Sequence, residues 1–145
     1  MAESASQTTT IEASPQHVFD VATDFERYPE WAKDVKEAVV QARDDQGRAI
    51  EVEFRASALG RSTHYTLAYD YANAPQVLGW SMVKGDIMRA IDGAYNFAPA
   101  ESGKATAVKY DLSIELVVPL PGFVKRRAEV RILNTIRELK ARAES

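Results

Sequence analysis

PLPGFVKRRAEVRILNTIRELKARAE, from Pro119 to Glu144, reads unlike the rest of the chain. Pro119, Pro121 and Gly122 cannot continue a paired strand, so a new element begins after them. A helix of some twenty residues spans about 30 Å and needs a broad apolar surface to pack on. The apolar residues after Gly122 recur at helical spacing and are Val124, Ala128, Ile132, Thr135 and Leu139, with Phe123, Val130, Leu133 and Ile136 beside them.

The residues before Pro119 mostly alternate between apolar and polar, which is typical of half-buried strands. Short turns separate these segments, and this indicates an antiparallel meander. Between the first two strands, Ser14 and Pro15 begin a short helix, and a second short helix or turn follows with Phe25, Tyr28 and Trp31 directed inward. The predicted strands are 4–12, 35–42, 50–58, 62–71, 78–83, 87–97 and 106–116.

These elements predict an α+β fold in which a strongly curved sheet of about seven strands closes around one long helix. The chain has 145 residues, 46% of them hydrophobic, which suits one domain over 1–145 with a core of about 4–143. The absence of cysteine excludes disulfides and thiolate metal sites. The first ten residues lack the basic start and apolar centre of a signal peptide, and no run of about 18 apolar residues follows. We therefore expect a cytoplasmic protein without membrane insertion.

Charge is distributed unevenly along the chain. The net charge is −3, which does not suggest a nucleic-acid partner. Residues 121–145 carry seven Lys or Arg and three Glu, a net +4, and the rest of the chain carries −7. The basic helix is either a solvated face that complements the acidic body or a contact surface for lipid, RNA or protein. Peripheral membrane contact also stays open.

Five stretches of this sequence resemble the START-like, or helix-grip (SRPBCC), superfamily. They are ASPQHVFDVATDFERYPEW near the start, GW within 76–82, GAYNFAP, TAVKYDL and PLPGFVKRRAE. Within that superfamily the chain is most similar to bacterial polyketide cyclase/dehydrase-type proteins, with coenzyme Q-binding-protein-like members close by. The resemblance covers about residues 4–143. It implies a cavity between the curved sheet and the long helix, open at one end, for an apolar ligand, but one fold serves many activities.

One face of the predicted sheet is rich in aromatic residues. Much of it would be needed simply as core, but four tyrosines each bring a hydroxyl that requires a partner when buried. Such hydroxyls suit a ligand pocket with a few polar groups better than a sealed core. The candidate ligand-binding residues are Phe54, Tyr65, Tyr69, Trp80, Met82, Arg89, Tyr95, Phe97, Tyr110, Leu112, Ala128 and Thr135.

Arg89 is the sharpest candidate on that face. If the strand over 87–97 is regular, Arg89 shares a face with Tyr95 and Phe97, where a guanidinium needs a partner such as a ligand carboxylate or carbonyl. If the strand bulges, or if Arg89 lies at the rim, the side chain reaches solvent instead. Both alternatives are compatible with the sequence.

Catalytic and metal motifs are weak. His17 and His64 lack a nucleophile elbow, an oxyanion glycine pattern and metal-ligand spacing, so we predict no metal and no cofactor. The inward face carries no His, Asp or Glu that could transfer a proton near neutral pH, which favours binding over catalysis.

Three functions remain open at this point. The first is binding of a lipid, isoprenoid quinone or polyketide-like molecule by a monomer or weak dimer. The second is a polyketide aromatase/cyclase or dehydrase in which Tyr65, Tyr110 and Arg89 polarise carbonyls, with orientation supplying much of the rate. The third is interaction with a protein or the ribosome through the basic helix. The sequence does not identify the ligand.

Overall fold

The computed structural model describes residues 2–58, 61–86, 88–116 and 134–145. Within them, seven strands form one antiparallel sheet in the order β1-β7-β6-β5-β4-β3-β2. The strands are β1 (Ala2–Ile11), β2 (Val35–Arg43), β3 (Ala49–Ala58), β4 (Arg61–Asp70), β5 (Val77–Gly85), β6 (Met88–Ala100) and β7 (Ala105–Leu116). The helical elements are α1 (Pro15–Thr23), the 3₁₀ helices η1 (Phe25–Glu30) and η2 (Glu101–Gly103), and a C-terminal helix over 134–144.

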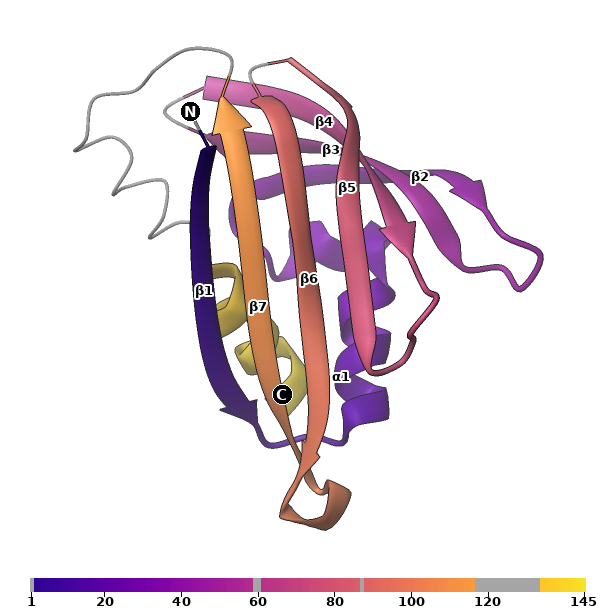
Figure 1. Ribbon diagram of the computed structural model, residues 1–145, viewed down its shortest axis with the longest axis vertical. Helices are drawn as coiled ribbons and strands as arrows, with labels where there is room; N and C mark the ends of the chain where they lie inside the picture. The colour runs from indigo at the N-terminus through magenta and orange to yellow at the C-terminus, as the bar shows by residue number, and fades with distance from the viewer. Residues whose placement is uncertain (1, 59–60, 87, 117–133) are drawn as a thin grey trace.

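The sheet is a meander with one long-range pairing. Strands β2 to β7 each pair with the next strand in sequence, and β1 pairs with β7. Figure 1 shows the sheet curving, with α1 and the C-terminal helix on the same side of it. The predicted curved antiparallel sheet of seven strands and the C-terminal helical segment are therefore confirmed.

The segment between β1 and β2 agrees with the prediction in part. The Ser14 hydroxyl accepts a hydrogen bond from the backbone N–H of His17 at 3.3 Å, and Pro15 begins α1. Such a cap satisfies an N–H group that the helix itself cannot bond. The second element is a six-residue 3₁₀ helix with Pro29 inside it. A proline lacks the N–H that an α-helix would use at this position, which suits the shorter 3₁₀ form.

The core lies between the helices and one face of the sheet, which we call the inner face. Alternate residues of each strand point to this face, as the pleat requires. Phe25 of η1, Val18 of α1 and Leu139 of the C-terminal helix are buried against it. The opposite side of the sheet, the outer face, carries mainly short or charged side chains.

Only the last part of the predicted long helix lies within the described residues. Its buried side chains are Ile136, Leu139 and Ala143, a spacing that places them on one helical face. The predicted beginning of this helix and the candidate residue Ala128 lie outside the described residues.

Candidate functional site: an aromatic inner face

Aromatic rings form a continuous path across the inner face. Ring centroids lie 4.9 Å apart for Tyr95 and Tyr110, 5.1 Å for Trp80 and Tyr95, and 6.1 Å for Tyr69 and Trp80. Phe25 of η1 joins this path at 4.3 Å from Tyr69. Rings at such separations and tilts interact favourably beyond their burial alone. The sequence alternation therefore brings together rings from β4, β5, β6 and β7.

The path continues toward β3. Phe54 stacks on Tyr65 at 5.5 Å and lies 6.3 Å from Phe25. At its other end, Phe97 stacks on Tyr95 at 5.5 Å. Phe54, Trp80, Tyr95, Phe97, Tyr110 and Leu112 are buried, whereas Tyr65, Tyr69 and Met82 are partly buried and packed against the same core. Thr135 of the C-terminal helix is half-buried.

The tyrosine hydroxyls divide into two groups. Tyr71 donates to the backbone carbonyl of Ala49 at 2.6 Å, and Tyr28 donates to the carbonyl of Ala22. The other four make no hydrogen bond within the described part of the chain; they are Tyr65, Tyr69, Tyr95 and Tyr110. The fully buried side-chain oxygens without a partner include only Thr66 Oγ1 among the described residues, so the four phenol oxygens border space that water or a ligand can reach.

Burial also keeps these phenols protonated. It raises the pKa of Tyr69, Tyr95 and Tyr110 well above the ordinary value, and neighbouring phenols add to the shift. For Tyr65, burial and then the negative charge of Asp34 raise the pKa to about 12. All four are therefore neutral O–H groups near pH 7, able to donate to a ligand oxygen.

Asp34 is a residue near the candidate site that sequence reasoning did not single out. It lies just before β2, is partly buried, and is close enough to Tyr65 for its charge to act on the phenol. Its backbone carbonyl accepts from Ser57 N–H at 2.8 Å, which ties this segment to β3. The alternation of β2 starts only at Val35, so no periodic signal pointed to Asp34.

The structure decides between the two positions that the sequence left open for Arg89. A bulge between Met88 and Ala90 shifts the register of β6, and Arg89 lies on the outer face. Its side chain is 62% exposed, and Nη1 lies 3.5 Å from Oε1 of Glu115 on β7. The parity argument fails because one extra residue in a strand moves the following side chain to the opposite face. Arg89 does not share a face with Tyr95 and Phe97.

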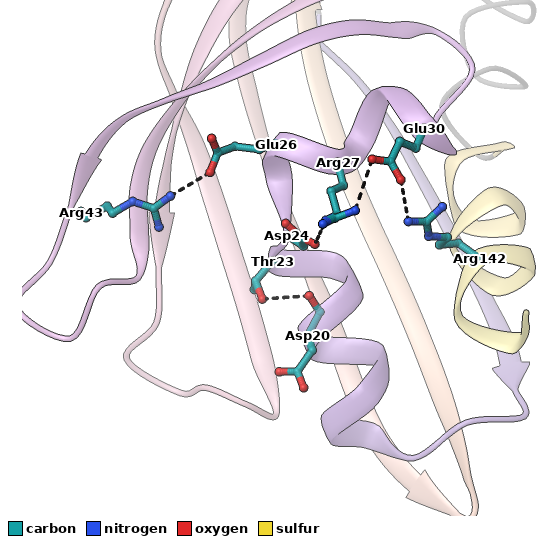
Figure 2. A network of polar contacts seen from close by, with 8 residues as sticks. All are labelled: Asp20, Thr23, Asp24, Glu26, Arg27, Glu30, Arg43 and Arg142. Atoms are coloured by element: carbon teal, nitrogen blue, oxygen red, sulfur yellow. Dashed lines mark hydrogen bonds and ion pairs between the residues drawn. The ribbon is translucent and has the colours of Figure 1, made fainter.

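The end of the C-terminal helix is fastened to the rest of the molecule by polar contacts. Figure 2 shows Arg142 reaching Glu30 of η1, at 2.8 Å, while Arg27 bridges Asp24 and Glu30. Lys140 donates to the carbonyl of Thr10 at 2.7 Å. Two of the basic residues of the predicted helix thus have partners within the chain.

Two further carboxylates secure the same helix. Glu138 accepts from Lys33 N–H at 2.7 Å, and Glu144 accepts from Glu12 N–H at 2.8 Å. The hydrogen bond from Glu12, followed by the contact with Lys140, lowers the pKa of Glu144. These contacts fasten the helix to β1, to η1 and to the residues that follow each of them.

Neither histidine forms a catalytic triad. Nε2 of His17 lies 3.1 Å from the carbonyl oxygen of Ala143, and exposed His64 lies 3.9 Å from Asp86. Asp86 in turn accepts from Thr63 and from the backbone N–H of His64. The residues that the structure describes contain no group of three or more His, Cys, Asp or Glu arranged to hold a metal. Among the described helices, none has the length and apolar character needed to cross a bilayer.

A shallow groove of about 430 Å³ occurs on the outer face, away from the aromatic rings. It arises because β1, β7 and β6 carry short side chains there. Its lining residues are Ser4, Ala5, Ser6, Asp92, Gly93, Ala94, Asp111, Leu112 and Ser113. The expected cavity between the sheet and the long helix would include residues 117–133, which lie outside the described residues.

Comparisons with known structures agree with this fold. A START superfamily protein from Mycobacterium smegmatis matches with a TM-score of 0.81 and 24% identity, covering 97% of this chain and 92% of that one. The Zhui aromatase/cyclase from Streptomyces sp. R1128 matches with a TM-score of 0.84 and 12% identity, covering 99% and 94%. A protein from Thermus thermophilus, TTHA0849, matches with a TM-score of 0.82 and 21% identity, covering 97% of each chain.

Sequence comparison identifies the family. No protein with a curated description matches this sequence. A family model described as "Polyketide cyclase / dehydrase and lipid transport" matches residues 2–144, nearly the whole chain. The predicted relationship to START-like, polyketide cyclase/dehydrase-type proteins is confirmed, and the chain belongs to this family.

Proposed function

We propose that the protein binds a hydrophobic or amphipathic small molecule between the inner face of the sheet and the C-terminal helix. One observation carries the proposal: four phenols of the inner face, two buried and two partly buried, have no hydrogen-bond partner within the described residues. They are Tyr65, Tyr69, Tyr95 and Tyr110. A core that served only stability would favour phenylalanine at such positions, because a hydroxyl without a protein partner adds no stabilising hydrogen bond. A ligand with oxygen acceptors would supply the missing partners.

The chemistry of the described inner face restricts the ligand. The rings offer a large apolar surface, and the phenols offer neutral donors. Arg89 points to the outer face, so it is no anchor for a carboxylate there. The ligand class that fits is an apolar molecule with carbonyl, ether or hydroxyl oxygens, such as an isoprenoid quinone, a polyketide or a lipid.

A polyketide aromatase/cyclase or dehydrase is the second candidate. The family description includes such enzymes, and one structural neighbour is an aromatase/cyclase. In this case Tyr65 and Tyr110 would donate to ligand carbonyls, and Asp34 beside Tyr65 would accept a proton from carbon. Holding both ends of a flexible chain together contributes to the rate even where acid–base groups are few.

Native mass spectrometry of protein purified from its own host tests the first candidate. The expected result is a co-purified apolar ligand that leaves on denaturation. Protein from that host that carries no ligand and also takes up no fatty-acid or quinone probe would contradict the proposal. An Asp34→Asn variant separates the two candidates, since binding alone predicts retained affinity and catalysis predicts loss of turnover with a poly-β-ketone.

A pair of tyrosine variants tests the role of the hydroxyls. Tyr110→Phe removes a hydroxyl without a described partner and should weaken an oxygen-bearing probe by about tenfold, as expected for one lost hydrogen bond. Tyr71→Phe is the matched control, because its hydroxyl is bonded to Ala49 and it should leave binding unchanged. Equal effects of the two substitutions would contradict the assigned role.

A further inference from the structure

Gly93 lies at the centre of the inner face, and its backbone conformation does not require a glycine. Its register partners are Trp80 on β5 and Leu112 on β7. Its φ angle is not in the left-handed region, unlike those of Gly47 and Gly103. A glycine inside a strand weakens the strand and commonly marks a close approach of another group. Something must therefore occupy the space beside its Cα.

The indole of Trp80 occupies that space. A Cβ at position 93 would lie 2.5 Å from Cζ2, 2.6 Å from Cε2 and 2.7 Å from Nε1 of this ring. These distances are well below ordinary contact, so any side chain at Gly93 would push the ring away from the strand. Side chains usually stand perpendicular to a sheet, whereas the indole lies down over the neighbouring strand.

The lowered indole forms the floor of the aromatic site. Tyr95, Tyr110 and Tyr69 surround it at centroid distances of 5.1, 5.8 and 6.1 Å. The height of the Trp80 ring above the sheet therefore determines how much room remains between these rings and the helix side.

We propose that Gly93 is a specificity-determining residue, which seats Trp80 low enough for a rigid planar ring system to reach the phenols. The inference rests on the proposed function, since it concerns the ligand of the same site. A planar ring needs the full width of the floor, whereas a slender saturated chain can pass beside a raised indole. Selectivity between these two shapes is the property that Gly93 controls.

Gly79 provides a matched control on the adjacent strand. It directly precedes Trp80, but a Cβ there would approach nothing closer than Gly93 O at 3.8 Å and Asp70 Cβ at 3.9 Å. These are ordinary contacts. Gly79→Ala and Gly93→Ala thus make the same chemical change on neighbouring strands, and only the second displaces the indole.

Equilibrium dialysis against two probes, 2-methyl-1,4-naphthoquinone and palmitic acid, tests the inference. The unaltered protein should bind both probes. For each probe, the dissociation constant of Gly79→Ala should equal that of the unaltered protein. Gly93→Ala should weaken the quinone about tenfold, an ordinary cost of one overpacked methyl group, and palmitic acid less than about threefold. The double variant Trp80→Phe/Gly93→Ala, whose smaller ring leaves room for the methyl group, should bind the quinone more tightly than Gly93→Ala.

The double variant also keeps the test informative if Gly93→Ala alone does not fold, because it is then compared with Trp80→Phe. Recovery of folding in the double variant would confirm that the methyl group and the indole compete for the same space. Equal weakening of both probes by Gly93→Ala, or no weakening of either, would overturn the inference. If the unaltered protein takes up palmitic acid but not the quinone, the inference about Gly93 is overturned and the proposed binding function is not. If the unaltered protein takes up neither probe, both are overturned.

Discussion

The two faces of the same sheet differ in almost every physical property. On β5, Leu78 and Trp80 point to the inner face and are 0% and 9% exposed, whereas Val83, at the register shift with β4, is 54% exposed. The inner face has tyrosines without described partners, and the outer face has ion pairs and a shallow groove. Because both faces share one backbone, alternation of the sequence alone separates a site for apolar ligands from a solvated surface.

The largest expected effect comes from truncating a buried and an exposed aliphatic side chain of the same strand. Leu78→Ala should lower the free energy of unfolding by about 2–5 kcal/mol, because it leaves a cavity in the core. Val83→Ala should change it by less than about 0.5 kcal/mol, since that side chain is mostly in solvent. Urea denaturation measures both. Similar losses for the two variants would mean that the faces are not as different as their exposure indicates.

Alkaline pH should expose the inner face through its tyrosines. All six tyrosines of the chain have a raised pKa because of burial, to about 12 for Tyr65 and Tyr71. A raised folded-state pKa means that the stabilisation is complete below the unfolded value near 10 and is lost as pH rises through 10 toward 12 and above. Each tyrosine then contributes up to about 1.4 kcal/mol of lost stability per pH unit.

Absorbance at the tyrosinate band is the measurement for this prediction. The native protein should show little tyrosinate near pH 10, followed by a steep rise that coincides with unfolding seen by circular dichroism. A protein denatured in urea is the control and should titrate near pH 10. A native titration with the same midpoint as this control would contradict the burial of the phenols.

Two buried threonines extend the comparison, and replacing either one should change the free energy of unfolding by about 1 kcal/mol. Thr66, between inner residues of β4, is 1% exposed and its hydroxyl has no hydrogen-bond partner among the described residues, whereas Thr106 on β7 donates to Ala13 O at 2.7 Å. Thr66→Val should raise the free energy of unfolding by about 1 kcal/mol, and Thr106→Val should lower it by about as much, because the first removes an unmet hydrogen-bonding need and the second creates one. Opposite signs in thermal unfolding are the expected result, and a loss in both variants would contradict it.

The sequence predicted what depends on local alternation and turn chemistry. The strands, their antiparallel order, the Ser14 cap and the aromatic composition of the inner face follow from period-two spacing and from residues such as Gly47, whose φ of 80° suits a turn. These signals involve neighbours in the chain, so they survive without knowledge of packing. The fold class was therefore accessible before the structure.

What escaped prediction depends on contacts between distant residues. The bulge at Arg89 was one of two alternatives that the sequence left open, and because no proline or glycine marks it, alternation alone did not decide between them. The effect of Asp34 on Tyr65 and the seating of Trp80 on Gly93 join different elements, and neither follows a period. The ligand-binding role of the aromatic residues stays a prediction that the experiments above address.

The smallest expected effect concerns Arg89, which distinguishes the two faces most directly. Its guanidinium is 62% exposed and pairs with Glu115 at 3.5 Å, so Arg89→Leu should change the free energy of unfolding by less than about 1 kcal/mol. Glu115 makes a further contact, so it keeps a partner when Arg89 is replaced. Affinity for palmitic acid should stay the same, whereas Tyr110→Phe serves as the inner-face variant that weakens an oxygen-bearing probe. A tenfold loss of affinity in Arg89→Leu would mean that the ligand reaches around the edge of β6, and that the separation of the two faces is incomplete at the bulge.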